Sequence, residues 1–473
     1  MNAVAAVEMP RGLDWVNTDH GPALSSLHGR LVLLYFWTFD SANCFNALED
    51  VRYLEQKFPD GVSVIGVHTP RYPHQRNTSV VLKTVNRLGL RHPVVNDPGF
   101  LLWQQFGVRA WPTCVLLDVD GSLVGLFTGE QRRAELEQRI THLLDVAARH
   151  DLRVFESWPV TAKPESRQAL SFPSRVLATE QHLYIVDTGR HRILETNHEG
   201  RVLRQFGSGN AQLWDGRTTD AAFQLPQGIC LLKDYLYVAD TGNHAIRRIR
   251  LHGGEVDTVA GGRNGRDRPQ DHADPAQVAM SQPSDVVGVG EDLYFSVAGQ
   301  NQIWRLDIAR KRLSVFAGSG QFGMSNGDGP YASFAGPAGL CVLGQQLIVA
   351  DAGASAIRLV RLADGQVSTV VGTGPFEFGD AAGKGDAVRL QHPLGVCTDP
   401  RGLVFIADSY NNRIKALNMR SGEVRSFKLP YSFQQPEGLS LAAGALWVAN
   451  TNAHEIVRVD LTSGVCKRIP VGE

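Results

Sequence analysis

A unit that recurs six times between residue 170 and the C-terminus constrains the fold of this chain more than any other feature. Each unit has a proline, and a short apolar stretch ends 14 or 15 residues after it. The prolines are Pro173, Pro226, Pro283, Pro337, Pro393 and Pro436, and the end positions are Asp187, Asp240, Val297, Asp351, Asp408 and Asn450. An isoleucine follows each end position by six residues. Constant intervals of this kind predict a repeated element of structure.

Each unit, roughly 50 residues long, indicates four short strands. In the second unit the strands are predicted at 228–233, 235–240, 245–251 and 254–261. Four-stranded units arranged radially make a β-propeller, in which closure of the ring removes most exposed strand edges. We therefore predict a six-bladed propeller over residues 171–473. The last unit carries its own fourth strand at 464–471, so the sequence leaves open how the ring closes.

Aspartate occupies four of the six end positions. A carboxylate at the end of a strand accepts backbone N–H groups of the turn that follows, which predicts a structural role. His191, His244 and His454 stand four residues beyond end positions, in the turns of separate units. Because these turns are not expected to converge, we predict neither a metal site nor a cofactor.

The N-terminal part alternates strands and helices. Strands are predicted at 31–39, 62–69 and 92–97, and helices at 44–58, 78–89 and 101–108. A hairpin follows at 113–118 and 122–129, and an amphipathic helix at 135–150 closes the region. This order predicts an α/β sheet with helices on both faces, over residues 1–149. Residues 150–170 are predicted to link it to the propeller.

Two local patterns and the repeats carry a family resemblance. The first strand runs through Phe36-Trp37-Thr38-Phe39 toward the helix with Cys44, and a later strand begins at Trp111-Pro112-Thr113. This resembles the thioredoxin fold, in which a redox motif opens a helix opposite a cis-proline. The stretches VADTGNHAI (238–246) and IADSYNNRIK (406–415) resemble the NHL repeat. Nearly the whole chain is thus similar to NHL-repeat proteins with an N-terminal thioredoxin-like domain.

The redox motif departs from that family. The family's usual stretch is Cys-Cys-Ile-Asn-Cys, whereas residues 40–44 read Asp-Ser-Ala-Asn-Cys. Ser41 therefore stands at the position of the attacking cysteine. A serine cannot attack a disulfide, and Ser41 is predicted to cap the helix. Cys44 remains at the resolving position, either as a small buried residue or as a thiol that forms mixed disulfides. Members of the family often carry a buried acidic residue six positions before the first cysteine, and here Tyr35 replaces it.

Composition excludes several function classes. Lys and Arg total 47 and Asp and Glu total 48, so the charge needed for nucleic-acid binding is missing. The longest apolar run, residues 31–37, is far shorter than the ~20 residues of a membrane-spanning helix. We see no signal-peptide pattern, and the six cysteines have no paired spacing. We therefore predict a cytoplasmic protein with neither nucleic acid nor membrane as a partner.

Three functions remain. The first is an interaction scaffold that binds a protein or peptide, since the resemblance implies that the backbone before the cis-proline pairs with an added strand. The second is a monothiol oxidoreductase that uses Cys44. The third, a propeller hydrolase with a central metal, needs converging ligands that the sequence does not show. The predicted binding residues are Trp37, Ser41, Trp111, Pro112 and Thr113, with Arg175, Gln227, Asp285 and Glu437 at the propeller mouth.

Overall fold

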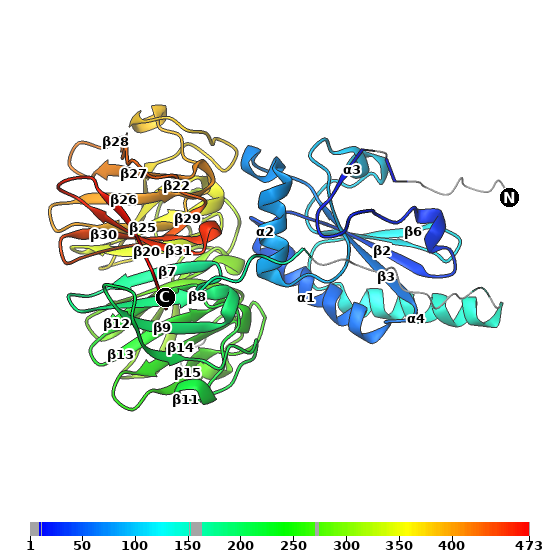
Figure 1. Cartoon of the computed structure of the whole chain (residues 1–473), viewed down its shortest axis with the longest axis horizontal. Coiled ribbons are helices and arrows are strands. Elements are labelled where there is room, and N and C mark those ends of the chain that lie inside the picture. Colours follow the sequence, from blue (N-terminus) through cyan, green and yellow to red (C-terminus); the bar gives the residue numbers. More distant parts are fainter. Residues whose placement is uncertain (1–8, 11, 151, 153–162, 270–273, 473) are drawn as a thin grey trace. The chain divides into compact units, whose positions relative to one another are not determined.

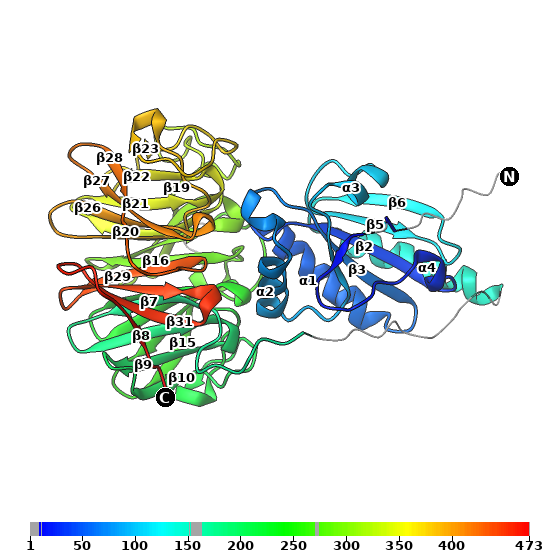
Figure 2. The same ribbon diagram turned by 45° about the horizontal axis from the view of Figure 1, so that its top comes forward.

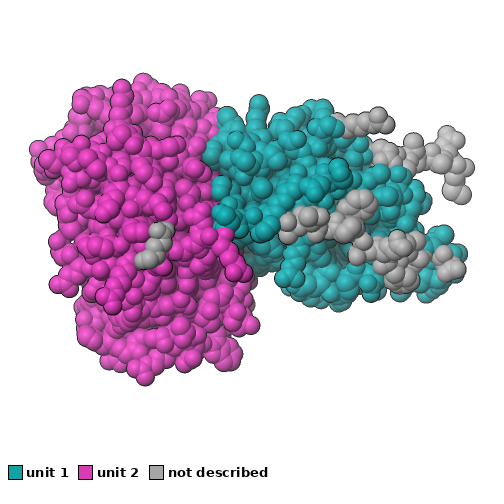
Figure 3. Space-filling model, viewed as in Figure 1, with its two compact units in different colours: residues 1–166 teal, residues 167–473 magenta. Residues whose placement is uncertain are grey.

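The computed structural model describes residues 9, 10, 12–150, 152, 163–269 and 274–472. The chain forms two compact units, Met1–Ser166 and Arg167–Glu473 (Figure 3). The division falls within the predicted linker 150–170, of which residues 151 and 153–162 lie outside the described part. Within the described ranges, no helix is long and apolar enough to cross a membrane.

The first unit is built on one six-stranded sheet with the order β1-β4-β3-β2-β5-β6. Strands β2, β3 and β4 are parallel, and β5 and β6 form the predicted antiparallel hairpin. A short edge strand, β1, was not predicted. The strands are β1 (Asp14–Trp15), β2 (Leu31–Trp37), β3 (Val62–His68), β4 (Val94–Asn96), β5 (Thr113–Leu117) and β6 (Leu123–Thr128).

Helices cover both faces of this sheet, as predicted. Helix α3 lies across the sheet from α1 and α4 (Figure 1). Because side chains alternate along a strand, Leu34 and Phe36 of β2 pack with Leu102 of α3, whereas Tyr35 points toward α1 and contacts Cys44. The helices are α1 (Ala42–Lys57), α2 (Thr78–Leu88), α3 (Leu101–Gln105) and α4 (Arg133–Arg149), with 3-10 turns η1 (Leu24–Leu27) and η2 (Pro73–Arg76).

The second unit is the predicted six-bladed propeller, with one antiparallel sheet for each repeat (Figures 1 and 2). Blades two and five each gain a short fifth strand. The first three blades are β7 (Pro173–Ala178), β8 (His182–Asp187), β9 (Arg192–Asn197) and β10 (Val202–Phe206); β11 (Gly216–Arg217), β12 (Gly228–Leu232), β13 (Tyr235–Asp240), β14 (Ala245–Arg250) and β15 (Glu255–Gly261); and β16 (Pro283–Val289), β17 (Asp292–Val297), β18 (Gln302–Asp307) and β19 (Arg312–Ala317). The others are β20 (Pro337–Leu343), β21 (Gln346–Asp351), β22 (Ala356–Arg361) and β23 (Val367–Val371); β24 (Gly383–Lys384), β25 (Gly395–Thr398), β26 (Leu403–Asp408), β27 (Arg413–Asn418) and β28 (Glu423–Ser426); and β29 (Pro436–Ala442), β30 (Ala445–Asn450), β31 (Glu455–Asp460) and β32 (Cys466–Ile469).

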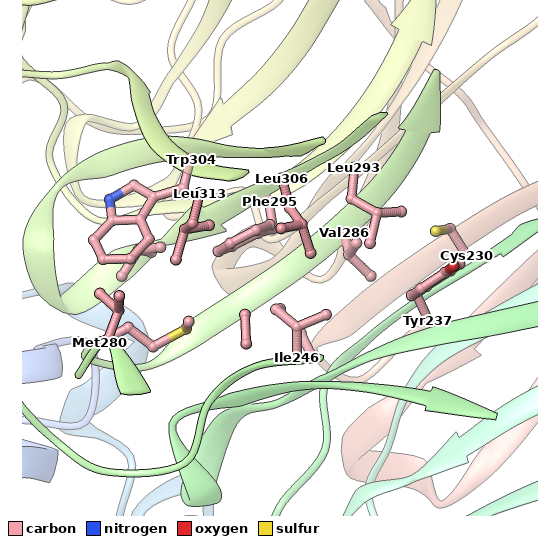
Figure 4. Packing of buried hydrophobic residues seen from close by; sticks show 14 residues of the cluster. Cys230, Tyr237, Ile246, Met280, Val286, Leu293, Phe295, Trp304, Leu306 and Leu313 are labelled. Carbon is pink, nitrogen blue, oxygen red and sulfur yellow. The ribbon is translucent and has the colours of Figure 1, made fainter. Parts of the chain in front are cut away.

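Apolar side chains fill the space between consecutive blades. Between blades two and three, Tyr237 and Ile246 pack against Phe295, Trp304 and other residues of the next sheet (Figure 4). Similar clusters join blades one to two, three to four, and six to one. Burial of large apolar side chains, at about 25 cal/mol per Å², is therefore the main force that holds the sheets face to face.

The aspartate at the end of the second strand has the predicted structural role, but its partner differs from our expectation. The Asp187 carboxylate accepts the backbone N–H of Ser171 at 2.6 Å, and Asp240 accepts that of Gln224 at 2.8 Å. Both donors precede the first strand of the same blade, rather than following in the turn. The same contact recurs in blades four, five and six, at Asp351, Asp408 and Asn450. In five of the six blades, these side chains therefore fix the segment before the first strand to the end of the second strand.

The residue four positions beyond each end position joins one blade to the next. It has a left-handed backbone, and its side chain accepts the N–H of the residue just before the following blade's proline. The acceptors are His191, His244, Asn301, Ser355, Asn412 and His454. His454 and Phe172 make this bond between blades six and one at 3.1 Å. Since β32 belongs to blade six, the ring closes without an exchanged strand.

Candidate functional site

The degenerate motif lies where β2 ends and α1 begins. Ser41 has an extended backbone, and its Oγ accepts the N–H of Cys44 at 3.4 Å, so the predicted helix cap is confirmed. This contact satisfies one of the backbone donors that a helix start leaves unpaired. The hydroxyl thus serves local structure at the position where the family carries its attacking thiol.

Cys44 is fully buried and poorly suited to thiol chemistry. Burial raises the pKa of its thiol to about 12, and the neighbouring Asp40 carboxylate disfavours the thiolate further. The hydroxyl of Tyr35, which occupies the position of the family's buried acid, donates to the Cys44 carbonyl. Burial also raises the pKa of Cys114 to about 12. Both thiols are protonated at neutral pH, whereas disulfide exchange requires a thiolate.

A carboxylate network that we did not predict stands beside Ser41. The buried side chain of Asp40 accepts hydrogen bonds from Thr38 Oγ1 at 2.6 Å and Gln75 Nε2 at 2.8 Å. Arg71 Nη1 lies 3.2 Å from the other carboxylate oxygen. Gln75 in turn accepts the backbone N–H groups of Arg71 and Tyr72. The network fixes the loop after β3 against the motif, and the Asp40 substitution in the family pattern was the sequence signal for it.

Trp37 lies in the core rather than on a binding surface. Its side chain is 1% exposed, stacks on Tyr35 and packs edge-on against His68. His68 is also buried, which lowers its pKa to about 4, and its Nδ1 lies 3.0 Å from Asn96 Oδ1. A neutral imidazole in this position is a packing group, so Trp37 and His68 support the motif from beneath.

The Trp111-Pro112-Thr113 segment presents unpaired backbone. The Trp111-Pro112 bond is cis, as the resemblance implies. Pro112 uses its carbonyl to accept the N–H of Gly129, and buried Thr113 donates to Ala110 O. The N–H and carbonyl of Trp111, by contrast, make no hydrogen bond to any described residue. An extended segment of another chain can therefore pair with them.

An aromatic cluster flanks this backbone. The Trp111 ring lies 4.7 Å from that of Trp103 and 6.5 Å from that of Phe100, and its Nε1 donates to Thr69 Oγ1 at 3.1 Å. All three rings are partly exposed, and Leu101 beside them is 48% exposed. Phe100 has a left-handed backbone with φ 60°, which is unfavourable for a bulky residue. The surface next to Trp111 is therefore apolar, and the backbone that places Phe100 on it is strained.

The propeller candidates Arg175 and Asp285 meet in the central channel. Arg175 Nη2 lies 3.1 Å from Asp285 Oδ2 and 2.9 Å from the Leu394 carbonyl, and Asp285 also accepts the N–H of Leu340. Glycine occupies the same position, two residues beyond the proline, in the four other blades: Gly228, Gly339, Gly395 and Gly438. A Cβ at Gly228 would lie 2.4 Å from Asp285 Cα, and one at Gly438 2.6 Å from Arg175 Cα. The glycines thus allow the first strands of neighbouring blades to approach closely around this ion pair.

The other two propeller candidates have intramolecular partners. Glu437 is buried, and its carboxylate accepts Gln435 Nε2 at 3.1 Å. The Gln227 carbonyl accepts Ser174 Oγ at 2.9 Å. Across the described parts of the chain, no group of three or more His, Cys, Asp and Glu side chains could hold a metal ion.

Comparison with known proteins places the fold in a family. The thioredoxin-like family model matches residues 29–123, and the NHL repeat model matches residues 390–417. The chain is 34% identical to NHL repeat-containing protein 2 of Gallus gallus, over 98% of this chain and 71% of that protein. The chain belongs to the NHL repeat-containing protein 2 family.

Two further relatives cover different shares of the chain. SUPPRESSOR OF QUENCHING 1, a chloroplastic protein of Arabidopsis thaliana, is 33% identical over 98% of this chain and 47% of its own length. Thiol-disulfide oxidoreductase ResA of Bacillus anthracis is 32% identical over 24% of this chain and 64% of its own length. The second similarity covers 116 residues, fewer than the 166 of the first unit.

Proposed function

We propose that this protein is a thioredoxin-like and NHL-propeller scaffold that binds an extended peptide segment of a partner protein without thiol chemistry. The unpaired backbone of Trp111, beside an aromatic surface, is the observation that carries this proposal. Backbone pairing supplies affinity in strand addition, and a neighbouring pocket or surface supplies specificity. The partly exposed rings of Phe100, Trp103 and Trp111 favour an apolar or aromatic side chain in the bound segment.

Loss of thiol chemistry follows from two residues. Ser41 replaces the attacking cysteine, and the thiol of Cys44 is buried with its pKa raised to about 12. The alternative is a monothiol oxidoreductase that uses Cys44. Similarity to a thiol-disulfide oxidoreductase favours this alternative, but it requires a thiolate that the burial of Cys44 opposes.

Peptide binding to the full chain tests the proposal. The probe is an array of short synthetic peptides, half of them carrying an aromatic residue, and each peptide is made with and without a cysteine. We expect binding to the aromatic members, weakened about tenfold by Trp111→Ala because ring contacts of 0.5–1.5 kcal/mol are lost. The Cys44→Ala variant should bind like the natural chain.

The matched control is Trp214→Ala, which removes an indole that is 64% exposed on the propeller and should leave binding unchanged. The melting temperature of each variant separates lost contacts from lost folding. Absence of binding to every peptide would overturn the proposal. Binding that requires both Cys44 and a cysteine in the peptide would overturn it in favour of the monothiol enzyme.

A further inference from the structure

Three of the six inter-blade hydrogen bonds depend on a histidine. His191 Nδ1 accepts the N–H of Leu225, and His244 Nδ1 accepts that of Gln282, each at 3.1 Å. His454 Nδ1 accepts the N–H of Phe172 at the same distance. An imidazole nitrogen accepts a hydrogen bond only while it carries no proton. These contacts therefore exist only in a tautomer with an unprotonated Nδ1.

The other three inter-blade bonds use acceptors that do not titrate. Asn301 Oδ1 accepts the N–H of Gly336 at 2.9 Å, and Asn412 Oδ1 accepts that of Gln435 at 2.7 Å. Ser355 Oγ accepts the N–H of His392 at 3.2 Å. The histidine acceptors and the acceptors that do not titrate do not alternate around the ring. The histidines join blades six to one, one to two, and two to three, and so include the closure of the ring.

We propose that the propeller has an acid-sensitive half, in which protonation of His191, His244 and His454 loosens the three consecutive boundaries around blades one and two. The boundaries from blade three to blade six keep their acceptors in acid. This conformational device goes beyond the proposed peptide binding and does not depend on it. Its effect is to make the ring open at a defined place when the pH falls.

The direction of the pH effect follows from linkage. Burial lowers the pKa of His191 below its ordinary value of 6.5, which an opened boundary restores. The closed form then binds fewer protons than the opened form. Its stabilisation is fully present above pH 6.5 and is lost as the pH falls below 6.5 toward the lowered pKa. At pH 5.5, one unit below the ordinary value, a histidine that takes up its proton only in the opened form favours opening by up to about tenfold.

Charged groups on the segments that meet at these boundaries are paired. Asp187 contacts Arg192, Asp240 contacts Arg247, and Glu455 lies 3.7 Å from Arg468. In blade three the end position is Val297, and Gln300 accepts the Ser281 N–H in place of a carboxylate. Burial raises the pKa of Asp187, and that of Asp240 to about 6, so these groups take up protons in the folded state and oppose the histidine effect. A histidine variant keeps them unchanged and isolates the histidine contribution.

Hydrogen exchange of the donor amides tests the proposal, with rates corrected for intrinsic exchange at each pH. We expect protection at Phe172, Leu225 and Gln282 to fall between pH 7.5 and 5.5, by up to about tenfold. Gly336 and Gln435 serve as control amides and should keep their protection. The His392 amide is not used as a control, because that residue is itself a histidine, whose ring stacks on Tyr410.

The chain itself supplies the matched variant, since asparagine fills the same position in blades three and five. The triple variant His191→Asn, His244→Asn, His454→Asn should lose no protection at pH 5.5. Equal loss at the control amides, or loss that persists in the triple variant, would overturn the proposal. If the triple variant fails to fold, Asn412→His decides: new acid-induced loss at Gln435 supports the proposal, and unchanged protection refutes it.

Discussion

The Ser41→Cys variant is expected to reduce insulin disulfides, with a rate above that of the natural chain by a factor on the order of ten or more. The new thiol would stand at the start of α1, where the helix dipole favours a thiolate. Cys44, three residues on, would then resolve the mixed disulfide. The measurement is insulin turnover with dithiothreitol as the reductant.

Two variants serve as controls for this gain. Ser41→Cys combined with Cys44→Ala should lose most of this gain, because only dithiothreitol is then left to resolve the mixed disulfide, and Ser41→Ala should show no gain. If Ser41→Cys gained no activity and showed no accessible new thiol, the missing attacking cysteine would not by itself explain the proposed loss of thiol chemistry. The geometry of the motif, and not the missing cysteine, would then prevent disulfide reduction.

The Arg358→Met variant should destabilise the propeller by about 3–5 kcal/mol. Arg358 and Asp351 form an ion pair, 3.1 Å apart, in which neither side chain is exposed. Removal of the guanidinium leaves a buried carboxylate without its counter-charge. Burial already raises the pKa of Asp351 to about 6. Because protonation relieves the uncompensated charge, the destabilisation should be larger at pH 7.5 than at pH 5. Denaturant midpoints at the two pH values measure both effects.

Arg361→Met on the same strand is the matched control, since Arg361 is half exposed and pairs with half-exposed Asp364. Its cost should stay below about 1 kcal/mol. Blade three shows how both partners can be replaced together, with Val297 and buried Trp304 at the corresponding positions. We therefore expect Asp351→Val combined with Arg358→Trp to recover part of the loss. An Arg358→Met cost near that of Arg361→Met would contradict this account of the ion pair.

The repeat intervals predicted the propeller because each interval spans one hairpin whose length the blade fixes. The partner of Asp187 was missed, since Ser171 lies 16 residues earlier and the local turn offered nearer donors. The Arg175–Asp285 bridge joins residues 110 positions apart, and pair contacts at that range leave no local pattern. Its signal was the glycine that stands at the same position in the other four blades.

In the thioredoxin-like unit, the motif and the cis-proline predicted the position of the candidate site but not which of its side chains are accessible. The residues of β2 form one apolar run, so the sequence did not distinguish the buried side chain of Trp37 from a surface one. The Asp40 network depends on Arg71 and Gln75, which come from the loop after the next strand. Their distance in sequence hides a contact that the parallel sheet brings about.

The alkylation rate of Cys44 in the folded chain, followed residue by residue by mass spectrometry between pH 6 and 10, tests most directly whether this domain works without thiol chemistry. Cys44→Ala identifies its signal among the six free cysteines. Because burial raises the pKa of Cys44 to about 12, we predict slow modification whose rate still rises at pH 10 without a plateau. Rapid modification that levels off below pH 7 would contradict the account and establish Cys44 as a reactive thiolate.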